Sequence, residues 1–123
     1  MYKLSVRSEF SAAHKLTGYE GQCKNLHGHN WKVRVSIFCD VIDDIGLTID
    51  FGIVKKDLNE IMDSLDHAYL NELNVFEGIN PTSENIAKHI YVEFKKKLAG
   101  QSAKVAEVEV WESDRTSMTY FEE

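Results

Sequence analysis

The chain has 123 residues, of which 43% are hydrophobic and 28% are charged, and its formal net charge is −6 at pH 7. This length and composition predict a single domain, residues 1–123, that buries an apolar core without disulfides. The acidic balance argues against nucleic-acid binding, which needs clustered Lys and Arg. No apolar run approaches the about 20 residues that cross a bilayer, and the N-terminus lacks the apolar block of a signal peptide. With two cysteines, we expect a cytoplasmic protein.

Two long segments alternate apolar and polar residues. Because side chains alternate between the two faces of a strand, this pattern predicts half-buried strands over residues 2–14 and 27–39. Between them, residues 15–26 contain glycines and no periodicity, which indicates a loop. Residues 43–46 are typical of a turn, and residues 47–50 are predicted to form a short returning strand.

The periodicity then changes to that of helices. Apolar residues three and four apart predict an amphipathic helix over about 52–66. A second helix follows Pro81, with Thr82 or Ser83 as its N-cap and Gly100 as its stop.

The last predicted elements are two strands, residues 105–112 and 116–121, which form a hairpin. The order ββααββ groups the helices together instead of alternating them with strands. It therefore favours the α+β class, with an antiparallel sheet packed on a helical layer.

Three histidines are expected to converge at one end of this sheet. His27 and His29 are two positions apart, so their side chains lie on the same face of one strand. His14 ends the preceding strand on its apolar parity, and pairing of the two strands would bring the three imidazoles together. Catalytic zinc commonly has three protein ligands and an open position, so we predict a metal site here. His89 has no such companion and is interpreted as structural.

Three further positions could take part in chemistry. Cys23 precedes His27 by four positions, and this spacing leaves two roles open, a fourth metal ligand or a thiolate beside an open site. Asp66 and His67 close the first helix, where the Asp could orient the imidazole for acid–base work or the pair could simply end the helix. Glu112 shares the parity of core residues, so its carboxylate is predicted to point inward toward a donor, which a ligand could supply.

Together these motifs resemble the 6-pyruvoyl-tetrahydropterin synthase family, especially its 6-carboxytetrahydropterin synthase branch of queuosine biosynthesis. The matching stretches run along nearly the whole chain in family order, at residues 10–14, 23–30, 49–51, 65–67, 70–71, 81–85 and 110–112. The resemblance implies the tunnelling fold, with a four-stranded antiparallel sheet and two helices on one face. In that fold, trimeric barrels stack into a homohexamer with active sites at subunit interfaces.

The resemblance also implies a role for each site residue. The implied Zn²⁺ ligands are His14, His27 and His29. The implied catalytic groups are the base Cys23 and a second proton-transfer pair, Asp66 and His67. The implied substrate-binding residues are Glu112, which would grip the pterin ring through its amide and amino nitrogens, and Thr82 and Ser83, which would line the ring pocket.

The implied substrate is 7,8-dihydroneopterin triphosphate, with its side-chain hydroxyls on the zinc. In the queuosine branch, zinc acts as a Lewis acid and the thiolate moves protons. A side-chain carbon–carbon bond breaks, giving 6-carboxy-5,6,7,8-tetrahydropterin, acetaldehyde and triphosphate. The biopterin branch instead eliminates triphosphate and rearranges to the 6-pyruvoyl product.

The loop before His27 favours the queuosine branch. Three residues separate Cys23 from His27, whereas animal biopterin enzymes resemble Cys-x-x-x-x-x-His-Gly-His. A third branch, routed to folate, has a glutamate in place of the cysteine, and residues 21–26 contain no acid. Ser83 and Ser113 stand where many relatives have Thr, without removing a group assigned to the chemistry. The alternatives are 6-pyruvoyl-tetrahydropterin synthase and a non-catalytic zinc or pterin-binding module in which the cysteine closes the metal site.

Overall fold

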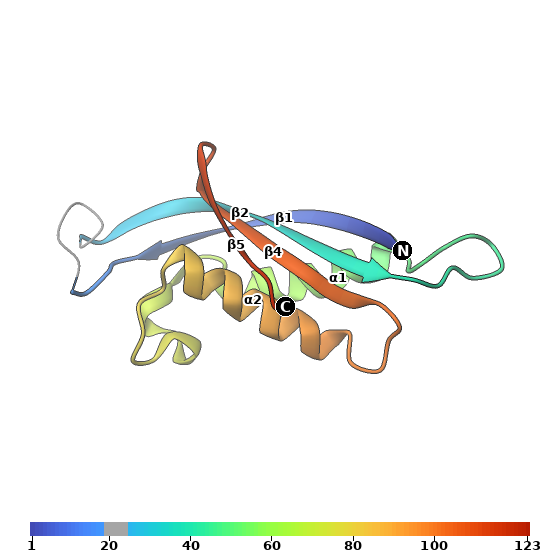
Figure 1. The fold of residues 1–123 in the computed structure, drawn as a ribbon. Coiled ribbons are helices and arrows are strands. Elements are labelled where there is room, and N and C mark those ends of the chain that lie inside the picture. The colour runs from blue at the N-terminus through green and yellow to red at the C-terminus, as the bar shows by residue number, and fades with distance from the viewer. Residues whose placement is uncertain (19–24) are drawn as a thin grey trace.

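The computed structural model describes residues 1–18 and 25–123. Its elements in chain order are β1 (Tyr2–His14), β2 (His27–Cys39), α1 (Phe51–Leu65), β3 (Ala68–Tyr69), the short 3-10 helices η2 (Leu70–Glu72) and η3 (Asn74–Phe76), α2 (Ser83–Lys97), β4 (Lys104–Ser113) and β5 (Thr116–Tyr120). Figure 1 shows the long strands lying as one layer over α1 and α2. The predicted α+β class is confirmed. None of the helices described is long and apolar enough to cross a membrane.

The sheet has the strand order β3-β1-β2-β4-β5. Four of the five predicted strands pair antiparallel with their neighbours, β1 with β2, β2 with β4 and β4 with β5. A fifth strand, β3, pairs in parallel with β1 at Ala12 and Ala13. The sequence did not predict β3, because two residues are too few to show a period.

The prediction of a short strand at residues 47–50 is wrong, because this segment is irregular. The carboxylate of Asp43 accepts a hydrogen bond from the backbone N–H of Leu47 at 2.9 Å. Asp50 instead caps α1, accepting from the backbone N–H of Gly52 at 2.7 Å. Side-chain bonds to the local backbone therefore take the place of strand pairing here.

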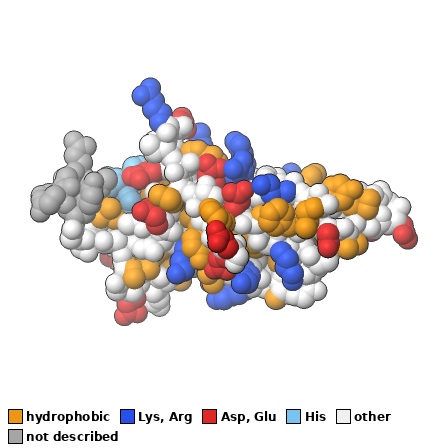
Figure 2. Space-filling model, viewed as in Figure 1, with side chains coloured by type: hydrophobic (Ala, Val, Ile, Leu, Met, Phe, Trp, Pro, Cys, Tyr) orange, Lys and Arg blue, Asp and Glu red, His pale blue; other side chains and the backbone are white. Residues whose placement is uncertain are grey.

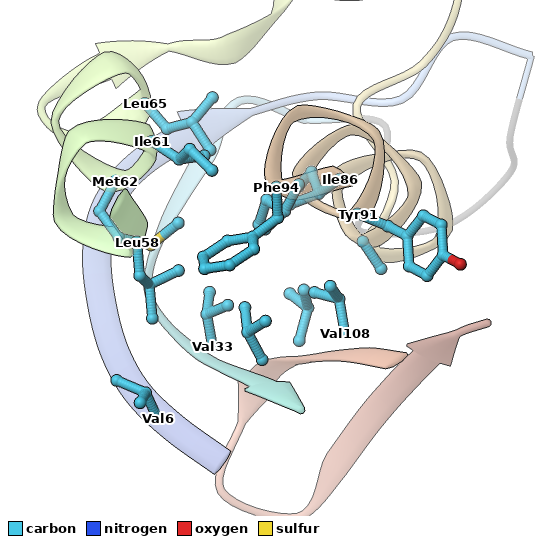
Figure 3. Close-up of a cluster of buried hydrophobic side chains, with 14 of the residues drawn as sticks. Val6, Val33, Leu58, Ile61, Met62, Leu65, Ile86, Tyr91, Phe94 and Val108 are labelled. Carbon is cyan, nitrogen blue, oxygen red and sulfur yellow. The ribbon is translucent and has the colours of Figure 1, made fainter. Parts of the chain in front are cut away.

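The core lies between the helices and the inner face of the sheet (Figure 3). Val33 and Val108 from the sheet and Leu58 and Phe94 from the helices are fully buried. Burial of such apolar side chains is the main stabilising contribution to a domain of this size. This packing fixes the inner face of β1 and β2, and both strands continue beyond the helices toward one end of the molecule (Figure 1).

Candidate metal centre and active site

The register of β1 and β2 brings the predicted histidines together. His14 lies directly opposite His27, and His29 lies opposite Ala12. The ring centroids of His27 and His29 are 4.7 Å apart, and those of His14 and His29 are 5.3 Å apart. The fully buried ring of Trp31 packs edge-on against His14 and His29, each at 5.0 Å between centroids. One end of the β1–β2 ribbon therefore carries all three imidazoles on its core face.

Backbone carbonyls determine which nitrogen of His14 and His27 carries a hydrogen. Nδ1 of His14 lies 2.7 Å from the carbonyl oxygen of Pro81, and Nδ1 of His27 lies 2.7 Å from that of Asn25. Because a carbonyl oxygen only accepts, both Nδ1 atoms donate, and the neutral form of each ring has a lone pair on Nε2. The two Nε2 atoms lie 2.9 Å apart. Lone pairs this close repel unless they share a cation, and an outer N–H bonded to a carbonyl is typical of metal-bound histidine.

His29 contributes a third nitrogen to this cluster. Its Nε2 atom is buried and makes no hydrogen bond to the residues described, although Oε1 of Glu112 lies 2.9 Å away. The contact therefore has the length of a hydrogen bond without its direction. Burial lowers the pKa of both His14 and His29 below the ordinary 6.5. Both rings are thus neutral at pH 7, which is the form that binds a metal.

The donor atoms have a spacing that suits a metal ion. The ligand atoms of His14, His27, His29 and Glu112 all lie within 4.8 Å of one another. A tetrahedral zinc site with metal–ligand bonds of about 2.0–2.1 Å places its ligand atoms about 3.3–3.4 Å apart. The closest donor pairs here are 2.9 Å apart, and Nε2 of His27 and Oε1 of Glu112 are 3.9 Å apart. The site therefore fits a small ion with nitrogen and oxygen ligands.

Glu112 reaches this cluster from a β-bulge. The register of β4 with β5 shifts between Trp111 and Ser113, which leaves Glu112 without a partner on β5. Bulges commonly re-aim a side chain near a functional site. The other carboxylate oxygen, Oε2, accepts a hydrogen bond from Oγ of Ser83 at 3.4 Å. Beside it lies a hollow of about 200 Å³ that Ser83, Glu112 and Thr116 help to line.

The start of α2 supports two members of the cluster. Pro81 contacts His14 through its carbonyl, and Ser83 contacts Glu112 through its hydroxyl. Between these residues, Oγ1 of Thr82 accepts the backbone N–H of Asn85 at 3.1 Å and caps the helix. Thr82 and Ser83, which the sequence grouped as pocket residues, therefore make different contacts.

Asp66 and His67 lie on the outer edge of β1. Oδ1 of Asp66 accepts the backbone N–H of Ser11 at 2.8 Å, and its Oδ2 lies 2.8 Å from Nδ1 of His67. The bond from Ser11 is the main reason that the pKa of Asp66 is lowered. The side chain of His67 is 85% exposed and, within the described ranges, makes no hydrogen bond to the three rings. A shallow hollow of about 440 Å³ has His67 and His29 on its wall. The structure thus brings this pair near the cluster without joining it.

Comparison with known proteins decides the family. Residues 3–123 match the family described as 6-pyruvoyl tetrahydropterin synthase. The chain belongs to this family. It is 36% identical to a protein of Synechocystis sp. named 6-carboxy-5,6,7,8-tetrahydropterin synthase, over 98% of this chain and 94% of the relative. A Rickettsia felis protein of the same name is 30% identical, over 92% and 95%. The structure of Caenorhabditis elegans 6-pyruvoyl tetrahydropterin synthase superposes with a TM-score of 0.88 at 26% identity, covering 99% of this chain and 96% of the other.

Two asparagines that support the site were not selected from the sequence as site residues. The side chain of Asn71 accepts the backbone N–H of Lys15 at 3.0 Å and donates to its carbonyl at 2.8 Å. Asn80 makes the same pair of bonds to Thr17, at 2.9 and 2.8 Å. Both hold the chain directly after His14. Asn71 belongs to a stretch that carried the family resemblance, and this was the available signal.

Two predictions stand apart from this geometry. Cys23 lies outside the described residues, so its predicted role stays a prediction. His89 packs its ring against Phe76 with centroids 5.6 Å apart, and burial lowers its pKa. This contact agrees with the structural role expected for His89.

Proposed function

We propose that this chain is a zinc-dependent 6-carboxy-5,6,7,8-tetrahydropterin synthase, a lyase. It converts 7,8-dihydroneopterin triphosphate and water into 6-carboxytetrahydropterin, acetaldehyde and triphosphate. The observation that carries the proposal is the cluster of His14, His27 and His29 with the carboxylate of Glu112 between it and a hollow. Two relatives named for this activity match more than nine-tenths of the chain.

Each part of the site has a task in this proposal. A bound zinc ion supplies Lewis-acid polarisation of the substrate's side-chain hydroxyls. Glu112 accepts hydrogen bonds from the amide and amino nitrogens of the pterin ring and so orients the ring. Ser83 steadies the second oxygen of that carboxylate. The buried indole of Trp31 keeps water from the inner side of the imidazoles.

Proton transfer is assigned to Cys23 and to the pair of Asp66 and His67. The thiolate of Cys23 removes a proton from a side-chain carbon next to a polarised hydroxyl. The carboxylate of Asp66 holds Nδ1 of His67, which leaves Nε2 free to give or take a proton. In a homo-oligomer with sites at subunit interfaces, this exposed pair can serve the cluster of a neighbouring copy.

A product assay tests the reaction. The zinc-loaded protein is incubated with 7,8-dihydroneopterin triphosphate, pterins are separated by chromatography with mass detection, and acetaldehyde is measured by a coupled alcohol dehydrogenase. We expect acetaldehyde and 6-carboxytetrahydropterin in equal amounts. A 6-pyruvoyl product without acetaldehyde would instead establish the second candidate, 6-pyruvoyl tetrahydropterin synthase, which the structural likeness to the Caenorhabditis elegans enzyme favours.

We also propose assembly into a homohexamer of two stacked trimers. Over the described ranges, β3 covers the outer edge of β1 only at Ala12 and Ala13, and β5 forms the opposite edge of the sheet. Such free edges can pair between copies. Apolar side chains also gather at the end formed by the β2–α1 connection (Figure 2). They are 45% to 80% exposed and include Val41, Ile42, Ile45, Leu47 and Phe51.

Light scattering coupled to size-exclusion chromatography tests the assembly. We expect the mass of six copies, and the mass of a monomer would contradict the proposal.

A cytoplasmic location is part of the same proposal. The buried free thiol of Cys39 is compatible with a reducing compartment.

A further inference from the structure

We propose that Glu112 alternates between two partners, the metal ion when the site is empty and the pterin ring when substrate is bound. Ring binding then withdraws the carboxylate and leaves a coordination position free for the substrate side chain. This inference rests on the proposed function for the identity of the ring, and on the structure for the position of the carboxylate.

The first observation is the charge around Glu112. The other two glutamates of β4 have cationic partners, which are Lys3 for Glu107 and Arg34 for Glu109. Across the part of the chain that the structure describes, the only ionisable side chains paired with Glu112 are histidines, His29 at 2.9 Å and His27 at 3.9 Å. Because Nδ1 of His27 donates to a carbonyl, its Nε2 carries a lone pair 3.9 Å from Oε1 of Glu112, and a shared cation removes the repulsion between them. Glu112 therefore completes a four-donor set for the metal.

The second observation is that the two oxygens of Glu112 face different surroundings. Oε1 belongs to the metal cluster, whereas Oε2 contacts Ser83 beside the hollow of about 200 Å³. The bond to Ser83 is 3.4 Å long, at the weak end of the range for a hydroxyl donor. Glu112 also lies at the bulge, without a partner on β5. The carboxylate thus lies between the metal cluster and the hollow. Neither its contact with His29 nor its bond to Ser83 is a strong hydrogen bond.

A shared carboxylate couples the two ligands. A pterin ring without a side chain binds Glu112 and provides no ligand that replaces this carboxylate on the metal. The metal and the ring therefore weaken each other's binding. By linkage, the factor by which the ring weakens metal binding equals the factor by which the metal weakens ring binding. The full substrate replaces the lost ligand with its own hydroxyls. The site thereby distinguishes complete substrate from the bare ring.

The first test measures zinc affinity by competition with a chromophoric chelator. We expect Glu112→Gln to weaken zinc binding by about tenfold or more, because an amide is a poor replacement for a carboxylate ligand. Glu107→Gln makes the same change on the same strand away from the cluster and should leave the affinity within about twofold. Equal zinc affinity in wild type and Glu112→Gln, with both variants folded by circular dichroism, would overturn the proposal.

The second test uses the wild-type protein and therefore does not depend on a variant folding. Unsubstituted pterin is titrated into metal-free and zinc-loaded protein. We expect pterin to bind about fivefold or more tightly without zinc, a coupling within the range typical of linked sites. Glu112→Gln should abolish the difference. Equal or tighter pterin binding with zinc present would reject the proposal. Failure of the acetaldehyde assay would reject the proposed function and leave both binding results standing.

Discussion

Nε2 of His14 and Nε2 of His27 lie 2.9 Å apart, while Nδ1 of each ring contacts a backbone carbonyl. The carbonyls belong to Pro81 and Asn25, so contacts within the fold orient both rings. Preorganised ligands lose little conformational freedom on binding, which favours high affinity. The geometry of this pair leads to the first prediction.

Replacing His14 should strongly weaken metal binding. His14→Ala removes a buried ligand and is expected to weaken zinc binding by about 100-fold. Metal content after dialysis, measured by mass spectrometry, checks the result. His89→Gln is the control, because His89 packs on Phe76 away from the cluster and its replacement should keep stoichiometric metal. A full complement of zinc in His14→Ala would show that the cluster is not the metal site.

Zinc affinity should depend on pH in a defined direction. Burial lowers the pKa of His14 and of His29 below 6.5, so protons compete with the metal at these rings only as the pH falls below that value. Affinity should be nearly constant from pH 7 to 8 and should fall only at a pH lower than 6.5, once the pH is under the lowered pKa of each ring, by about tenfold per unit for each ring that must release a proton. Chelator competition across this range measures it. A steep rise between pH 7 and 8 would contradict the prediction, since it requires a ligand protonated at neutral pH.

Thr82 and Ser83 should give opposite results when each is changed to Ala. Thr82→Ala removes the N-cap of α2 and should cost about 1 kcal/mol of unfolding free energy, with pterin affinity nearly unchanged. Ser83→Ala removes the contact to Glu112 and should weaken pterin binding by about threefold, with little loss of stability. Urea unfolding and pterin titration of both variants test this. Matching effects in the two variants would contradict the division of roles.

Cys23→Ala separates catalysis from a structural metal site. If the thiol is the base, the variant keeps its zinc and loses turnover on 7,8-dihydroneopterin triphosphate, whereas loss of zinc would identify Cys23 as a ligand. Metal content and product formation are measured on the same sample. Full turnover in the variant would contradict both roles.

The core between α2 and the sheet should be sensitive to truncation. Phe94 is fully buried, and Phe94→Ala is expected to lower the free energy of unfolding by about 3–5 kcal/mol through lost burial and a cavity. Val92, on the same helix, is 36% exposed, and Val92→Ala should change stability by no more than about 0.5 kcal/mol. Urea denaturation of the two variants provides the comparison. Similar losses for both would argue against the packing described.

The long strands and the meeting of the three histidines could be predicted from the sequence, because side-chain parity carries that information. The strands at residues 2–14 and 27–39 begin and end where the alternation does. The two register shifts of β4, at Ser36 and Ile37 of its partner and near Glu112, could not be predicted, because a bulge has no sequence period.

The contacts that support the site residues could not be predicted from the sequence either. His14 is oriented by the backbone carbonyl of Pro81. Every residue has such a carbonyl, so the residue type does not predict this contact. The position of Asp66 and His67 on the outer edge of β1 depends on how α1 returns to the sheet, and His67 takes a left-handed backbone conformation with φ of 56°. Such conformations are unusual for a residue other than glycine and arise from the tertiary context.

The pairing of His14 with His27 across two antiparallel strands has an evolutionary consequence. Insertions or deletions between residues 18 and 25 change the length of a connection whose two ends are held by the strand pairing, so we expect them to leave His14 and His27 in place. That connection also carries the cysteine. If Cys23 is the proposed base, a lineage can reposition that thiol relative to the substrate while the three histidines keep their places.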